Sequence, residues 1–299
     1  MQYLKIEKEF PKFDSCVITL GKFDGIHLGH KKLVDKVIQK KRDGVPAVLF
    51  SLGAAEKMIF TREEREHTLE EKGIDVLIEC PLSKQIRSMS PVEFIKQILI
   101  DRFHVKCVVV GEDFRFGYER KGNPRLLEQY GKKYGYETIV IPKEMYGKRK
   151  ISSTFIREEL EKGRMESVSR LLGHNYYADG VVEHGNGIGH KKLLPTINLI
   201  PSTSKLMPPN GVYMTITHFK HVSYPGITNV GYKPTIGEKF VGIETYLFGC
   251  DEDLYEQPCR VEFFHFSRPE KKFESLDALK KQLAKDEEDG KAFFEKKKN

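Results

Sequence analysis

The residues best suited to chemistry lie in one run near the start of the chain, Gly21-Lys22-Phe23-Asp24-Gly25-Ile26-His27-Leu28-Gly29-His30. Its glycines permit tight turns and allow the backbone to approach a ligand closely. The run follows a short apolar segment and opens a segment with helical signals, where free N–H groups at a helix N-terminus attract phosphate. His27 and His30 lie on one side of the first helical turn, and both can donate to phosphoryl oxygens. The run is not a P-loop, because no Gly-Lys-Ser/Thr follows it.

Two further runs could complete a nucleotide site. The run Ile151-Ser152-Ser153-Thr154-Phe155-Ile156-Arg157 is predicted to open a helix. Its hydroxyls could cap that helix, and Arg157, one turn on, offers a planar fork for phosphate oxygens. The preceding Lys148–Lys150 run is equally compatible with a solvated surface. The third run, Gly111–Gly117, follows a predicted buried strand, and ligands of open α/β sheets bind at such strand ends. Asp113 is therefore better placed to contact a ligand than to be buried unpaired.

The elements that would position these runs alternate between strands and helices up to about residue 160. Short apolar runs rich in β-branched residues suit strands buried on both faces of a parallel sheet. They are Cys16–Leu20, Ala47–Phe50, Asp75–Cys80, Val105–Val110 and Thr138–Ile141. Helical signals lie between them, including capping boxes that begin at Thr61 and Ser90. This alternation predicts a Rossmann-like open α/β sheet with right-handed crossovers.

The second half of the chain has a different pattern. Between residues 177 and 266, short β-rich runs are separated by Gly and Pro, which is typical of a small antiparallel barrel. A terminal helix packed on that barrel is predicted by three leucines at helical spacing, Leu276, Leu279 and Leu283. We therefore expect an α/β domain over residues 1–173 and a β domain over residues 174–299.

The three N-terminal runs together resemble the motifs of the prokaryotic FAD synthetases, the bifunctional riboflavin kinase/FMN adenylyltransferases, and the likeness covers nearly the whole chain. The first run is a variant of the His-x-Gly-His nucleotidyltransferase signature. The resemblance implies transfer of AMP from ATP to FMN without a covalent enzyme intermediate, with Mg²⁺ sharing the charge. The implied residues are the catalytic His27 and His30, the nucleotide-binding Gly21, Phe23, Asp24, Gly25, Ser153, Thr154 and Arg157, and Asp113 at the nucleotide or flavin site.

The C-terminal half is similar to the riboflavin kinase module of the same family, which phosphorylates riboflavin with ATP. The likeness rests on Pro195-Thr196-Ile197-Asn198, Gly211-Val212-Tyr213 and Ile243-Glu244-Thr245. In that module, the Thr and Asn help to hold Mg²⁺ and the nucleotide phosphates, and the Glu acts as base towards the riboflavin hydroxyl. Carried over to this chain, the metal ligands are Thr196 and Asn198, and the catalytic base is Glu244.

Two stretches depart from the family pattern. The usual Thr-Phe-x-Pro-His-Pro after the second strand is replaced by Leu49–Ala54, which could change flavin affinity. In the kinase phosphate loop, Leu193 replaces a Gly and His190 replaces an Arg. A leucine hinders a close or left-handed backbone, and a neutral histidine weakens a phosphate contact. An active kinase and a chain that only adenylylates FMN therefore both stay open.

Composition is compatible with small-molecule substrates. The chain has 50 basic and 43 acidic residues, a mild excess that suits polyphosphates as well as nucleic acid. The absence of a long apolar run, the charged N-terminus and five cysteines without zinc or redox spacing lead us to expect a cytoplasmic protein without a membrane partner. The rival hypotheses are another nucleotidyltransferase, or a flavin-sensing or RNA-binding regulator. No basic stripe interleaved with aromatics supports nucleic-acid binding, and the oligomeric state stays unknown.

Overall fold

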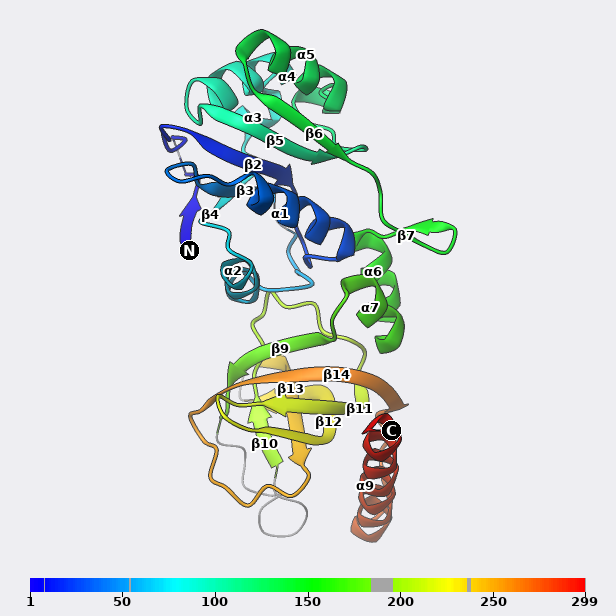
Figure 1. Cartoon of the computed structure of the whole chain (residues 1–299). Helices are drawn as coiled ribbons and strands as arrows, with labels where there is room; N and C mark the ends of the chain where they lie inside the picture. Colours follow the sequence, from blue (N-terminus) through cyan, green and yellow to red (C-terminus); the bar gives the residue numbers. More distant parts are fainter. Residues whose placement is uncertain (8, 54, 184–195, 236–237, 299) are drawn as a thin grey trace. The chain divides into compact units, whose positions relative to one another are not determined.

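A computed structural model of the chain describes residues 1–7, 9–53, 55–183, 196–235 and 238–298 (Figure 1). The chain divides into two compact units, Met1–Ser153 and Thr154–Asn299. Helix α6 (Ser153–Glu161) begins at this division and is followed by α7 (Met165–Leu172), which packs on strands of the second unit. The domain limit that we placed after residue 173 stays a prediction.

In its described residues, the first unit contains a six-stranded parallel sheet in the order β1-β4-β3-β2-β5-β6. The strands are β1 (Gln2–Lys5), β2 (Cys16–Gly21), β3 (Ala47–Leu52), β4 (Val76–Cys80), β5 (Val105–Gly111) and β6 (Glu137–Ile141). Each strand except β1 overlaps a predicted apolar run, so the expected Rossmann-like parallel sheet is confirmed. The sequence analysis missed β1 because it is short and has no buried residue.

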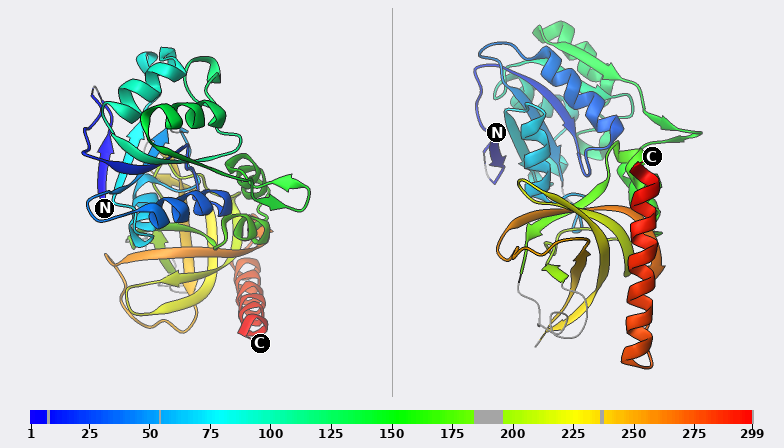
Figure 2. Two further views of the ribbon diagram at one scale, coloured as in Figure 1. Left: turned by 45° about the horizontal axis from the view of Figure 1, so that its top comes forward. Right: turned by 60° about the horizontal axis from the view of Figure 1, so that its bottom comes forward.

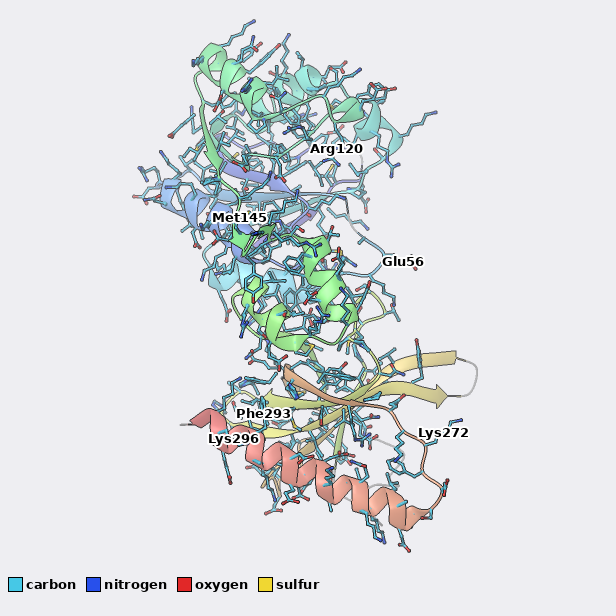
Figure 3. The ribbon with its side chains drawn as sticks, turned by 90° about the vertical axis from the view of Figure 1, so that its right-hand side faces the viewer. Glu56, Arg120, Met145, Lys272, Phe293 and Lys296 are labelled. Atoms are coloured by element: carbon cyan, nitrogen blue, oxygen red, sulfur yellow. The ribbon has the colours of Figure 1, made fainter. Side chains whose placement is uncertain are left out.

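Helices cover both faces of this sheet because successive side chains of a strand point to opposite sides. Ile18 of β2 enters one core with Phe94, whereas Val17 enters the other core with Val34. The helices are α1 (Leu28–Lys40), α2 (Arg62–Glu71), α3 (Lys84–Ser88), α4 (Pro91–Glu93) with its π-helical continuation Phe94–Ile100, and α5 (Pro124–Tyr134). A 3₁₀ turn, η2 (Tyr118–Arg120), and a hairpin of β7 (Met145–Tyr146) and β8 (Arg149–Lys150) complete the unit, and Met145 marks that hairpin in Figure 3.

The second unit contains, where it is described, an antiparallel sheet in the order β10-β13-β12-β11-β14-β9. Its strands are β9 (Tyr176–Val181), β10 (Thr196–Leu199), β11 (Gly211–His218), β12 (Ser223–Thr235), β13 (Glu238–Leu247) and β14 (Pro258–Pro269). A bridge between Glu183 and Asn198 brings the segment after β9 back to β10. The sheet thus curls into the expected barrel, and the predicted terminal helix, α9 (Leu276–Lys298), runs along it (Figure 2).

Across the described residues, none of the helices combines the length and the apolar character that crossing a bilayer requires.

Candidate functional site

Two of the N-terminal motifs meet where the order of the parallel strands reverses. β2 has β3 on one side and β5 on the other. The loop after β2 leads to His27 and His30, and the loop after β5 carries Asp113. Ligands of open α/β sheets bind at the carboxyl ends of the strands at such a switch point. The fold therefore brings these two sequence motifs to one edge of the sheet.

His27 and His30 form a stacked pair at the start of α1. Their ring centroids lie 3.7 Å apart, and the ring planes are inclined by 16°. His27 caps the helix, because its Nδ1 accepts a hydrogen bond from the backbone N–H of His30 at 3.2 Å. The Nδ1 of His30 is buried and has no hydrogen-bond partner among the described residues. A buried polar atom of this kind is one that a bound ligand could satisfy.

The glycine between the two histidines leaves room for this stacking. A Cβ atom at Gly29 would lie 3.2 Å from both Cε1 and Nδ1 of the His27 ring. In the loop before it, Phe23 and Ile26 have positive φ angles of 48° and 30° although neither is glycine. Such strained backbone persists only where the surroundings hold it, and it concentrates at functional sites.

Burial lowers the pKa of both imidazoles. Loss of solvation is the largest cause for His27, and it lowers the pKa to about 4 against a weaker opposing backbone hydrogen bond. Loss of solvation, followed by the proximity of His27, lowers the pKa of His30 well below its usual value. Both rings are therefore neutral near pH 7. A bound anion would favour their protonated forms, so the pair can respond to a phosphate ligand by taking up a proton.

Three side chains hold the histidine loop in place, those of Phe23, Asp24 and Ser153. The Oδ1 atom of the buried Asp24 accepts a hydrogen bond from the backbone N–H of Ile59 at 2.7 Å. The Oγ atom of Ser153 donates to the backbone carbonyl of Asp24 at 2.8 Å. Phe23 is fully buried, and its ring centroid lies 4.8 Å from that of His30. Nucleotide binding by Phe23, Asp24 and Ser153 stays a prediction, as does nucleotide binding by Gly21 and Gly25.

Thr154 and Arg157 follow Ser153 on α6. Thr154 is exposed, whereas Arg157, one turn beyond Ser153, is half-buried. A hydroxyl and a guanidinium near a helix start suit phosphate oxygens. Their part in triphosphate binding stays a prediction.

Asp113 forms ion pairs with Lys143, which follows β6, and with Lys150 of β8. Its Oδ2 lies 3.3 Å from the Nζ of Lys150 and 3.8 Å from the Nζ of Lys143. Sequence reasoning left the run containing Lys150 open as a solvated surface and missed this pairing. Phe114 packs against the core, and its ring stacks on that of Phe116. The loop thus turns its aromatic side chains inward and its carboxylate outward.

An open groove of about 410 Å³ on the first unit was also missed by sequence reasoning. Its lining comprises Leu82, Lys84, Arg87, Ser88 and Tyr118. Tyr118 is 48% exposed, so part of its ring faces the solvent. The turn that presents it has positive φ angles at Gly117, Glu119 and Arg120. Only Gly117 could have signalled this turn, because a positive φ at the other two residues leaves no trace in the sequence.

In the second unit, a cavity of about 610 Å³ contains the predicted kinase base. Its polar strand residues are Thr196, Thr228, Asn229 and Glu244. Its other walls comprise Val212, Ile227, Tyr246, Arg268, Glu270, Lys271, Lys272, Phe273, Leu279, Leu283 and Asp286. The last of these walls come from α9 and from the segment that precedes it, on which Lys272 is labelled in Figure 3.

Glu244 lies between two asparagines of neighbouring strands. Asn198 of β10 and Asn229 of β12 are its cross-strand partners, and such partners share one face of the sheet. The Oγ1 atom of Thr196 donates to Oε1 of Glu244 at 2.9 Å. Hydroxyl, amide and carboxylate oxygens are the ligands that Mg²⁺ prefers, so Thr196 and Asn198 fit the metal-binding role that the sequence predicted. Sequence reasoning did not single out Asn229.

Thr196 also lines a second cavity of about 300 Å³, whose other residues include Ile197 and Asp251–Tyr255. No group of three or more His, Cys, Asp or Glu side chains in the described ranges could hold a metal ion. His190 and Leu193, the two departures in the kinase loop, lie outside the described residues.

Comparisons with known proteins match both halves of the chain. A family model described as FAD synthetase matches residues 10–155, and one described as riboflavin kinase matches residues 172–294. The chain is similar to proteins named bifunctional riboflavin kinase/FMN adenylyltransferase. That of Buchnera aphidicola subsp. Schizaphis graminum is 35% identical over 296 residues, with 94% of each chain covered. That of Escherichia coli K12 is 31% identical over 293 residues, with 94% of this chain and 93% of the relative covered.

A solved structure extends the likeness to the whole fold. It is named as a macrolide-efflux protein from Streptococcus pneumoniae and is 28% identical to this chain. Its TM-score is 0.82, and the match covers 96% of this chain and 97% of that one.

Proposed function

This chain belongs to the bifunctional riboflavin kinase/FMN adenylyltransferase family, and from that premise we propose which of its residues carry out each reaction. It transfers AMP from ATP to FMN to give FAD and pyrophosphate, and it carries a C-terminal riboflavin kinase module. The division of labour among the residues, the use of Mg²⁺ and a cytoplasmic location form our proposal. All five cysteines are free, which supports a cytoplasmic location because the cytosol keeps thiols reduced.

In adenylyl transfer, His27 and His30 bind the phosphates of ATP. An oxygen of the FMN phosphate attacks the α-phosphorus in line, the bond to the bridging oxygen breaks, and pyrophosphate leaves. Negative charge then grows on the leaving group, where fixed donors are most effective. The unsatisfied Nδ1 of His30 at the start of α1 is the observation that carries this assignment. Thr154 and Arg157 of α6 would bind other oxygens of the triphosphate. Asp113, in the loop after β5, would orient the nucleotide or the flavin.

We place the FMN acceptor at the groove that Leu82 and Tyr118 line. An aromatic ring and an apolar side chain suit the isoalloxazine, and Lys84 and Arg87 offer positive charge to its phosphate. Gly53, which lies in the segment that replaces the family's Pro-His-Pro, is next to a residue of this groove. A Cβ atom at Gly53 would lie 3.0 Å from Cδ1 of Leu82. This neighbourhood supports an effect of the departure on flavin binding.

In the kinase reaction, riboflavin would occupy the 610 Å³ cavity with its terminal hydroxyl at Glu244. The half-buried carboxylate accepts the hydroxyl proton as that oxygen attacks the γ-phosphorus of ATP, and ADP leaves. Thr196 and Asn198 would hold Mg²⁺, which supplies neutralisation of the phosphate charge when bound. The apolar walls and the few convergent polar groups of this cavity support a flavin ligand.

The two assignments are tested by assays with FMN and riboflavin supplied separately. His30→Ala should lower FAD formation from FMN and MgATP by about 10²-fold, the scale of a lost transition-state donor. Lys31→Ala, on the same helix and exposed, is the matched control. Near-normal FAD formation by the His30 variant would refute its role. Incubation of the native chain with riboflavin and MgATP alone tests the kinase activity. If neither FMN nor FAD forms, the chain is not a riboflavin kinase.

A further inference from the structure

An ion pair between a partly exposed arginine and a buried aspartate joins the terminal helix to the barrel at the edge of the 610 Å³ cavity. Arg268, at the end of β14, donates from Nε to Oδ1 of Asp286 on α9 at 2.9 Å, and its Nη2 pairs with Oδ2. Asp286 is only 2% exposed. Its Oδ1 also accepts a hydrogen bond from Nε2 of Gln282 at 2.9 Å. The carboxylate is thus held by a bidentate guanidinium and by an amide from its own helix.

The next residue of α9 makes a second polar contact on a different strand. The Tyr246 hydroxyl of β13 donates to Oε1 of Glu287 at 3.3 Å. One turn on, Gly290 allows close approach of the helix, because a Cβ atom there would lie 2.8 Å from the Phe248 ring and 3.0 Å from Ile227. Asp286 and Glu287 are thus held by residues of β14 and β13, respectively. Together these contacts set the rotation of α9 about its axis and its position along the barrel.

This alignment decides which residues of α9 face the cavity. Leu279 and Leu283 lie seven and three residues before Asp286, so all three share one helix face, and all three line the cavity. At the far end of α9, Phe294 packs edge-on against Phe264 of β14. Figure 2 shows the helix lying lengthwise along the barrel.

We propose that Arg268 and Asp286 are positioning residues of the riboflavin kinase reaction, which hold Leu279 and Leu283 as the wall against which the flavin lies. The proposal rests on the placement of riboflavin in this cavity. An ion pair with a buried carboxylate gives little net stability, because the charge of Asp286 loses its hydration and that of Arg268 loses part of it. Its planar bidentate geometry, however, permits only one alignment of the two side chains. The pair therefore specifies where the helix sits, and through it how the riboflavin hydroxyl meets Glu244.

The test uses the full chain and measures riboflavin binding by quenching of flavin fluorescence, alongside steady-state riboflavin phosphorylation. Asp286→Asn removes the charge and keeps the shape. A displaced wall should raise the Kd and KM for riboflavin by about tenfold or more, since small misplacements are costly to a bound geometry. The KM for ATP and the rate of FMN adenylylation should not change. The matched control is Asp289→Asn, an exposed aspartate on the same helix.

Two milder variants keep the test valid if Asp286→Asn fails to fold. Gln282→Ala removes the amide contact, and Glu287→Ala removes the contact with Tyr246; neither leaves an unpaired buried charge of opposite sign. Each variant should raise the riboflavin Kd, while calorimetry should show that its barrel is still folded. Riboflavin affinities equal to that of the Asp289 variant would overturn the proposal. If the native chain itself does not bind riboflavin, the placement of the flavin fails first and this inference fails with it.

Discussion

The imidazole rings of His27 and His30 lie stacked, with centroids 3.7 Å apart, in the space left by the missing side chain of Gly29. Two charged rings at this distance would repel each other, and burial already disfavours the charge on each. The pair is therefore neutral near pH 7 unless a bound anion compensates the charge. The spacing of the rings leads to the first prediction below, and their neutral state leads to the next two.

Gly29→Ala should lower FAD formation several-fold, because the added methyl group shifts the His27 ring slightly from its place beside the phosphates. Gly29 does not have a positive φ, so the loss would come from the contact and not from the backbone. The measurement is FAD formation from FMN and MgATP. Riboflavin phosphorylation should be unaffected, and normal FAD formation by this variant would contradict the spacing argument.

The stability of the first unit should fall as the pH drops from about 6.5 to about 4. In this window the unfolded state takes up a proton at His27 that the folded state excludes, since burial lowers the folded pKa from 6.5 to about 4. That shift corresponds to about 3 kcal/mol. The measurement is calorimetric unfolding at a series of pH values, because the chain has no tryptophan whose fluorescence could report unfolding. His27→Asn, which keeps a capping side chain, should show a shallower decline, and an identical slope would rule out His27 as the source.

Binding of ATP should be accompanied by proton uptake. The phosphates favour the protonated imidazoles and raise pKa values that burial has lowered. Titration calorimetry at pH 6.5 in two buffers of different ionisation enthalpy measures the number of protons exchanged. His30→Asn should reduce the uptake. Equal binding enthalpies in both buffers would show that the histidines do not meet the phosphates.

Asp24→Ala should destabilise the first unit by about 1–3 kcal/mol, because it leaves the buried N–H of Ile59 without its acceptor. Asp24→Asn retains an acceptor oxygen and should lose much less stability and FAD synthesis. The comparison separates support of the loop from contact with the nucleotide. Equal losses of FAD formation in two well-folded variants would indicate that the charge itself contacts the ligand.

Glu244→Gln should lower riboflavin phosphorylation by about 10²–10⁴-fold, the usual contribution of a general base. The amide keeps the shape of the side chain, so its contact with Thr196 can persist while the base is lost. Product analysis with riboflavin and MgATP measures the effect, and FMN adenylylation by the same sample is the internal control. A variant that phosphorylates riboflavin normally would exclude Glu244 as the base.

Local features of the fold were predictable from the sequence. The capping boxes at Thr61 and Ser90 open α2 and α4 as expected, because a capping box involves residues only three apart. The buried strands were recognisable because parallel strands covered on both faces are continuously apolar. The histidine and Glu244 motifs were likewise readable, since each lies within a few consecutive residues.

The sequence by itself thus determined that an α/β part precedes a β part, most of their strands and helices, and the short motifs that carry the chemistry. Only the tertiary structure decided that Asp24 supports the histidine loop, that Asn198 and Asn229 lie on either side of Glu244, and that Asp286 meets Arg268. These contacts join residues far apart in the chain. They depend on strand order, register and helix rotation, which the spacing of residues within a single element does not specify.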